Sequence, residues 1–248
     1  MHTDVTDLRD FYHSALGLVV RRVLAQKIRK IWPRPAGCAI IGYGFATPFL
    51  GSYRGEAVRI GALMPATQGA LVWPSADRNI TALVEEAQLP LADNSVDRML
   101  VIHGLEVAER PGMLLREMWR VLAPEGRILV IVPNRSGVWA RTDRTPFGQG
   151  RPYSSGQLDQ ILREAMFTPL TRTSALFLPP VSQGVVLRSA ATMERIGARI
   201  SGRFAGVILV EAGKEVVAPV GTMVPVAARL RVALPAAAAP LPDGSRRL

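Results

Sequence analysis

The stretch that decides the fold runs from Glu85 to Asn134 and reads EEAQLPLADNSVDRMLVIHGLEVAERPGMLLREMWRVLAPEGRILVIVPN. Residues 97–102 and 127–132 have the length and composition of buried strands, and residues 111–122 between them have the pattern of a helix. A strand, a helix and a strand at this spacing predict a parallel crossover unit. Ligands of such sheets bind beyond the carboxyl ends of the strands. The residues predicted at this edge are Glu85, Glu86, His103 and Asn134.

The segments on either side of this stretch supply the other elements of a layered α/β fold. Short apolar runs predict further strands, and periodic segments between them predict helices. The predicted strands are residues 37–42, 58–64, 80–84, 185–187 and 207–210, with further β structure at 167–177; the helices are residues 156–166 and 190–200. We therefore predict a doubly wound, mostly parallel sheet of seven strands with helices on both faces.

The two ends of the chain differ in character from this central region. Residues 7–32 carry apolar side chains at three- and four-residue steps and predict an amphipathic helix, which either packs on the sheet near the ligand site or lies on a membrane surface. Residues 215–248 are rich in Pro, Ala and Val and predict an extended or disordered tail. The expected organisation is an N-terminal helical region (1–35), a central domain (36–214) and this tail.

Composition narrows the classes of function. The 30 Lys and Arg exceed the 20 Asp and Glu by ten, but the basic residues are spread along the chain, so an ordinary basic protein is favoured over a nucleic-acid binder. Cys38 is the single cysteine, which excludes an internal disulfide and argues against a metal site built from cysteines. The polar N-terminus and the lack of an apolar run of about 18–20 residues predict a cytoplasmic protein without a membrane span.

Several motifs together resemble one known family. LPLADNSVD, the strand after it, LLREMWRVLAPEGRILVIVPN and GQLDQILREAMF, with a glycine turn at Gly42 to Ala46, are similar to the class I S-adenosylmethionine-dependent methyltransferases of the type 11 kind. The resemblance covers roughly residues 37–170. It implies a Rossmann-like fold, S-adenosylmethionine as cofactor, and transfer of its methyl group to an acceptor that is expected to be small and anionic.

The resemblance also implies which residues contact the cofactor. The glycine turn lets a ligand approach the backbone closely, an acid after the third strand accepts a hydrogen bond from the adenine amino group, and the end of the second strand lies against the ribose. His103 either lines the pocket or acts as a base, since an imidazole accepts protons near neutral pH. The predicted set is Gly42, Tyr43, Gly44, Ala46, Met64, Glu85, Glu86 and His103.

Three positions depart from the family pattern. Ile40 and Met64 stand where the family usually has acids, and Val107 replaces a frequent histidine. Each polar partner that a buried ribose loses costs about 1–3 kcal/mol, so these departures predict weak binding, a substitute partner or no binding. The alternative function is therefore a catalytically inactive methyltransferase-like protein that binds or regulates another protein through its N-terminal helix or its C-terminal tail.

The loop that follows the fifth strand, residues 134–153, is long for a compact domain and combines aromatic with basic side chains. Aromatic rings form the walls of pockets, and guanidinium groups bind carboxylates or phosphates. We predict a substrate lid that includes Trp139, Arg141, Arg144 and Tyr153. The alternatives are a solvated loop pinned by its aromatic residues and base stacking on RNA, which would need a broader basic surface.

Overall fold

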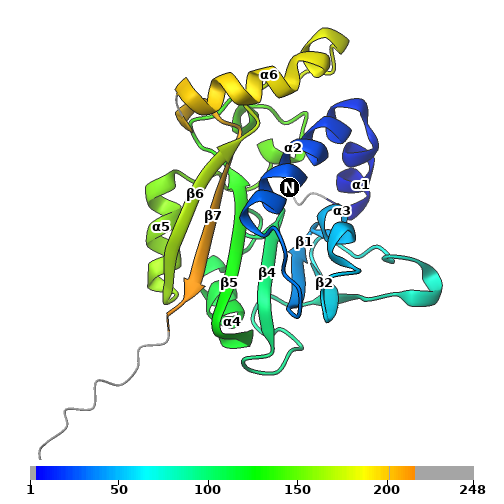
Figure 1. Cartoon of the computed structure of the whole chain (residues 1–248), viewed down its shortest axis with the longest axis vertical. Helices are drawn as coiled ribbons and strands as arrows, with labels where there is room; N and C mark the ends of the chain where they lie inside the picture. Colours follow the sequence, from blue (N-terminus) through cyan, green and yellow to red (C-terminus); the bar gives the residue numbers. More distant parts are fainter. Residues whose placement is uncertain (1–3, 201, 216–248) are drawn as a thin grey trace, which may run out of the picture. The chain divides into compact units, whose positions relative to one another are not determined.

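The computed structural model describes residues 4–200 and 202–215, all within one compact unit (Figure 1). Its seven-stranded sheet has the order β3-β2-β1-β4-β5-β7-β6. The strands are β1 (Ala39–Gly44), β2 (Arg59–Pro65), β3 (Thr81–Val84), β4 (Val96–Ile102), β5 (Leu122–Pro133), β6 (Phe167–Ala175) and β7 (Val207–Lys214). The pairs among β1 to β5 are parallel, whereas β7 is antiparallel to both β5 and β6. The predicted fold class is confirmed.

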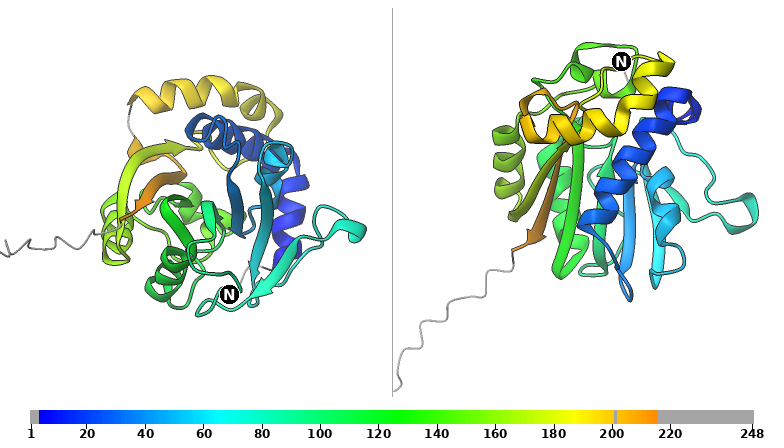
Figure 2. Two further views of the ribbon diagram at one scale, coloured as in Figure 1. Left: turned by 60° about the horizontal axis from the view of Figure 1, so that its bottom comes forward. Right: turned by 45° about the horizontal axis from the view of Figure 1, so that its top comes forward.

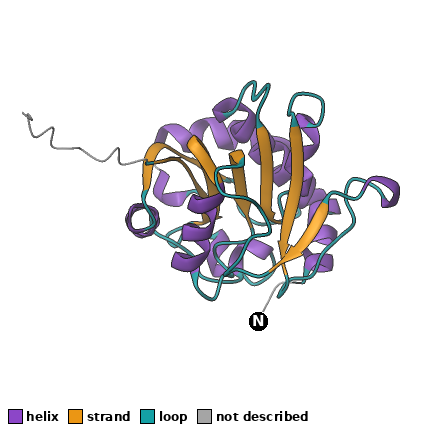
Figure 3. Ribbon diagram, turned by 90° about the horizontal axis from the view of Figure 1, so that it is seen from below, coloured by secondary structure: helices purple, strands orange, loops and turns teal. Residues whose placement is uncertain are grey.

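Helices cover both faces of the sheet (Figure 3). The helices are α1 (Val5–His13), α2 (Ala15–Ile31), α3 (Thr47–Leu50), α4 (Pro111–Val121), α5 (Ser155–Glu164) and α6 (Gly184–Ile200). Short 3-10 turns are η1 (Gly51–Tyr53), η2 (Ala76–Arg78), η3 (Trp139–Arg141), η4 (Pro146–Gly148) and η5 (Gly202–Phe204). Successive strand residues point to opposite faces, so Met99 and Val101 of β4 pack under α4 and α5, whereas Leu100 and Ile102 pack under α1, α2 and α3.

The predicted single helix at residues 7–32 is two helices. The chain breaks at Ser14, whose backbone is extended and whose hydroxyl caps α2 by accepting from Gly17 N at 3.1 Å. A Cβ on Gly17 would lie 1.8 Å from the carbonyl oxygen of Phe11, so only glycine permits this close approach of α1 to α2. As a result α1 turns away from α2 and reaches over the sheet edge where β1 and β4 end.

The strand predicted at residues 185–187 is wrong, because these residues belong to the first turns of α6. The helix predicted at 190–200 is the remainder of the same element. Figure 2 shows α6 alongside α2, and the two helices are in contact. No helix within residues 4–200 and 202–215 is long and apolar enough to cross a membrane. The predicted tail lies outside the described residues.

Candidate functional site at the carboxyl ends of the strands

The glycine turn lies at the carboxyl end of β1, as predicted, and it is tightly packed. A Cβ on Gly44, which has a φ of +78°, would lie 2.3 Å from the carbonyl oxygen of Ile102 in β4. A Cβ on Gly42 would lie 2.6 Å from the Cβ of Ala46 at the start of α3. Both glycines are therefore required by packing within the sheet and against α3, irrespective of any ligand.

Helix α1 covers this turn. The Tyr12 ring stacks on Phe45, with ring centroids 5.6 Å apart, and only 3% of Tyr12 is exposed. Val5 N donates to the carbonyl oxygen of Gln68 at 2.9 Å, and the Gln68 side-chain amide donates to the carbonyl oxygen of His103 at 2.7 Å. The four predicted turn residues are all buried, but Tyr43 packs in the core cluster on the opposite face of the sheet from α1. Within the turn, α1 therefore covers Phe45 directly.

Met64, predicted at the ribose, ends up in the core at the end of β2. It is 1% exposed, and its sulfur accepts a hydrogen bond from Leu71 N at 3.3 Å. Asp77, the first carboxylate in the chain after β2, lies exposed in η2 and does not line the nearby pocket. Thr67, just beyond β2, does line it and carries the hydroxyl closest in the chain to this strand end.

That pocket has a volume of about 260 Å³ and opens where β2 and β3 end. It is lined by Pro65, Ala66, Thr67, Val84, Glu85, Glu86, Ala87, Glu109, Arg110 and Met113. The structure separates the roles of the two acids. The Glu86 carboxylate accepts from Glu109 N at 3.1 Å and from Arg110 N at 3.2 Å, so it fixes the loop after β4. The Glu85 side chain is exposed and forms no hydrogen bond or ion pair with any described residue, which leaves its carboxylate free for a ligand.

The Tyr43 hydroxyl is a second polar group near this pocket. It is buried and has no hydrogen-bond partner among the described residues. Burial raises the pKa of Tyr43 well above its ordinary value, with smaller contributions from the Glu86 and Glu85 carboxylates. An unpaired buried hydroxyl is costly. Tyr43 itself is fully buried and does not line the pocket.

Beneath α1, three buried polar side chains form a row at the end of β4. The Tyr12 oxygen lies 2.9 Å from His103 Nε2, and His103 Nδ1 lies 3.4 Å from the Glu106 carboxylate. Burial, and secondarily Glu106, raises the pKa of Tyr12 well above its ordinary value, so the phenol keeps its proton. Because the Glu106 carboxylate favours an N–H at Nδ1, Nε2 is left to accept a hydrogen bond from the Tyr12 hydroxyl. The imidazole proton then resides on Nδ1 and faces Glu106.

Glu106 is the residue of this row that sequence reasoning missed. Both of its carboxylate oxygens are buried without a hydrogen-bond partner among the described residues. A buried carboxylate whose nearest polar partner is an imidazole nitrogen at 3.4 Å is rare outside functional sites. The sequence shows Leu105 and Glu106 side by side, but it does not show that Glu106 is buried. Glu106 is buried because the chain turns sharply at His103, whose φ is +52°. No sequence pattern predicts that turn.

The long loop reaches this row through Phe147, whose ring centroid lies 4.7 Å from that of His103. Two of the four predicted lid residues are instead buried: Trp139, whose Nε1 donates to the carbonyl oxygen of Leu178 at 2.7 Å, and Tyr153. They pin the loop to the body. The loop thus contacts His103. Its predicted aromatic residues, Trp139 and Tyr153, are buried, whereas Arg141 and Arg144 are exposed.

Comparisons with known proteins agree with this architecture. The family model described as "Methyltransferase domain" matches residues 42–130, from the glycine turn into β5. The ubiquinone/menaquinone biosynthesis C-methyltransferase UbiE of Rubrivivax gelatinosus is 44% identical over 54 residues, which are 22% of this chain and 22% of that protein. The matched part thus spans about a fifth of the length of this curated relative.

Solved methyltransferases share the fold. An S-adenosylmethionine-dependent methyltransferase of Thermotoga maritima, described as a possible histamine N-methyltransferase, superposes with a TM-score of 0.63 at 17% identity over 85% of this chain and 96% of its own. The geranyl diphosphate C-methyltransferase of Streptomyces coelicolor, in complex with S-adenosylhomocysteine, gives 0.52 at 14% identity over 77% of each chain. These structures show that the chain has the fold of the class I S-adenosylmethionine-dependent methyltransferases, and residues 42–130 are similar to the methyltransferase domain family.

Proposed function

We propose that this chain binds S-adenosylmethionine at the carboxyl ends of β1 to β4 and supports methyl transfer to a small anionic acceptor. The observation that carries the proposal is the pocket at the ends of β2 and β3, where the carboxylate of Glu85 is free. Glu85 acts electrostatically on Tyr43 of the glycine turn, and both residues lie in the region that the methyltransferase family model matches. The volume of the pocket suits a nucleoside rather than the whole cofactor. The remainder of the cofactor would occupy the region that α1 now covers.

The pocket residues fit the nucleoside. Glu85 would accept hydrogen bonds from the adenine amino group, and the Thr67 hydroxyl would bond the ribose in place of the acid that β2 lacks. Met113 and Val84 provide apolar walls for the base. The cofactor, when bound, supplies an already activated methyl group, so the protein's part is mainly alignment and exclusion of water.

Helix α1 is, in this proposal, a displaceable cover hinged at Ser14. Its movement would have two consequences at once. It would expose the glycine turn, and it would take the Tyr12 hydroxyl away from His103. Nε2 would then be free to accept a proton from the acceptor, with Glu106 holding the opposite side of the ring and stabilising the imidazolium. Arg141 and Arg144 on the adjacent loop would attract the anionic acceptor.

Calorimetric titration of the full chain with S-adenosylmethionine and S-adenosylhomocysteine tests the proposal. We expect saturable binding of one ligand. Glu85→Gln should weaken it about 10-fold or more, since a hydrogen bond to a charged group contributes about 1.5–3 kcal/mol. The matched control is Glu164→Gln, an exposed acid on α5, which should leave affinity unchanged. No heat and no thermal shift at millimolar ligand would overturn the proposal and favour the inactive, partner-binding alternative.

A further inference from the structure

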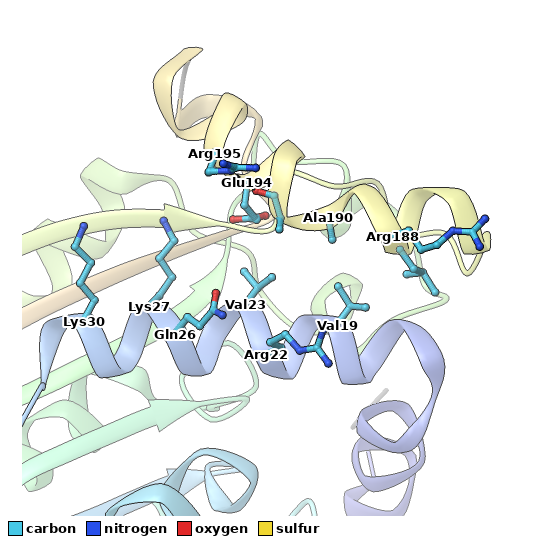
Figure 4. A pocket seen from close by; sticks show the side chains of 12 residues that line it. Val19, Arg22, Val23, Gln26, Lys27, Lys30, Arg188, Ala190, Glu194 and Arg195 are labelled. Carbon is cyan, nitrogen blue, oxygen red and sulfur yellow. Dashed lines mark hydrogen bonds between the residues drawn. The ribbon is translucent and has the colours of Figure 1, made fainter.

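A second cavity, apart from every residue named above for cofactor or acceptor, lies between α2 and α6. It is a groove of about 600 Å³ that is half open to solvent (Figure 4). Its lining residues are Val19, Arg22, Val23, Gln26, Lys27 and Lys30 from α2, and Leu187, Arg188, Ala190, Ala191, Glu194 and Arg195 from α6. The volume falls within the ~300–1,000 Å³ of pockets that hold small organic ligands.

The floor of the groove is apolar. Val23 of α2 and Ala190 of α6 face each other across it, and Val19 extends the apolar strip along α2 (Figure 4). Both helices belong to the same face of the core, and the small side chain at Ala190 leaves part of the space between them unfilled. Val23 and Ala190 are already buried. The apolar surface that an aliphatic group would cover therefore belongs mainly to half-buried Val19 and Leu187 and to exposed Ala191.

The walls of the groove are strongly basic. Five cations line it against one carboxylate, and within the part of the chain that the structure describes none of these five forms an ion pair. The nearby Arg29 shows the contrast, because it points out of the groove and pairs with Glu56. Like charges gathered around a low-dielectric hollow repel each other and concentrate anions. The charge of the groove therefore calls for an anionic ligand.

Glu194 is an independent sign that a ligand belongs here. It is 8% exposed and projects from α6 toward α2 (Figure 4). One carboxylate oxygen accepts from Phe177 N at 2.6 Å, whereas Oε2 is buried with no hydrogen-bond partner among the described residues. A carboxylate oxygen without a partner is satisfied only by a donor, and the remaining P–OH of a monoalkyl phosphate is such a donor.

We propose that the groove binds a single-chain alkyl phosphate, with its phosphate head held by the cations of α2 and α6 and its aliphatic chain lying along Val19, Val23 and Ala190. The combination of an apolar floor and unpaired cations matches both parts of such a molecule. Inorganic phosphate would contact only the cations, and a neutral hydrocarbon would contact only the apolar floor. The inference does not depend on cofactor binding.

Titration of the full chain with monomeric dodecyl phosphate tests this, with inorganic phosphate and dodecyltrimethylammonium as comparison ligands. We expect saturable one-to-one binding of dodecyl phosphate only. The double variant Arg22→Gln, Lys27→Gln should weaken it at least about tenfold. The matched control, Arg116→Gln with Arg163→Gln, removes the same charge from exposed sites on α4 and α5 and should not.

Ala191→Trp supplies a second, steric test, because Ala191 is exposed on the groove wall and a larger side chain fits there without disturbing the core. It should abolish dodecyl phosphate binding while the thermal midpoint stays unchanged. Three results would each overturn the proposal. The first is equal weakening of binding in the control variant, and the second is binding of many dodecyl phosphate molecules without saturation. The third is binding of the protein to anionic vesicles but not to dodecyl phosphate monomers.

Discussion

Weakening the packing of α1 is predicted to destabilise the protein and yet tighten its hold on the cofactor. Leu8 is fully buried on the underside of α1, within the core cluster that includes Tyr12 and Phe45. Replacing such a leucine with alanine costs about 2–5 kcal/mol. If the cofactor binds only when α1 is displaced, its apparent dissociation constant equals the intrinsic constant divided by the open fraction.

The expected size of the effect follows from that relation. A loss of about 2 kcal/mol from the covered state raises a small open fraction roughly 30-fold, because each 1.4 kcal/mol is a factor of ten. Leu8→Ala should therefore bind S-adenosylhomocysteine up to about 30-fold more tightly in calorimetry. The gain ends once the open state dominates.

Leu162→Ala is the matched control. Leu162 is equally buried, but it lies in α5 on the opposite face of the sheet. It should lower the free energy of unfolding, measured with urea, by a similar amount and leave affinity unchanged. The reasoning is refuted if Leu8→Ala is destabilised and binds S-adenosylhomocysteine no more tightly than the wild type.

Three further predictions concern single groups. Tyr12→Phe leaves His103 Nε2 without its partner, so the free energy of unfolding should fall by about 1–3 kcal/mol in urea titrations; an unchanged midpoint would contradict the buried hydrogen bond. Arg141→Ala with Arg144→Ala should reduce transfer of labelled methyl groups to small acids while cofactor affinity stays the same, and unchanged transfer would reject their role in the lid. Burial raises the pKa of Glu194 above its ordinary 4.5, so the stability contributed by this group is complete below that pH and is lost as pH rises toward the folded pKa. Glu194→Gln should therefore reduce the loss of unfolding free energy between pH 4.5 and neutrality. If the variant and the wild type show the same dependence of unfolding free energy on pH, the contribution of Glu194 is excluded.

The sheet was readable from sequence because its strands are nearly continuous apolar runs with turns between them. Residues 97–102 and 127–132 appear as the central strands β4 and β5, and the acids at 85–86 lie at the predicted edge. The strand predicted at 185–187 failed for the opposite reason. A short run of Val and Leu does not distinguish a strand from the first turns of a helix, and α6 is decided by its packing against α2.

The candidate site was only partly readable. Sequence placed the glycine turn, Glu85 and His103 together, since all follow strand ends. It did not reveal that α1 covers the turn, because the contact between Tyr12 and His103 joins residues 91 apart in the chain. It also did not distinguish the free Glu85 from Glu86, which caps the loop after β4. Such pairings depend on three-dimensional approach rather than on local pattern.

The central claim is that α1 is a cover over a cofactor site. Amide hydrogen exchange of the full chain with and without S-adenosylhomocysteine tests it most directly, because local opening and ligand protection are read residue by residue. The account predicts that ligand increases protection at residues 81–87 and decreases it in α1, residues 5–13. Increased protection of α1 would show that the helix closes over the ligand instead, and an unchanged pattern at both segments would contradict the account altogether.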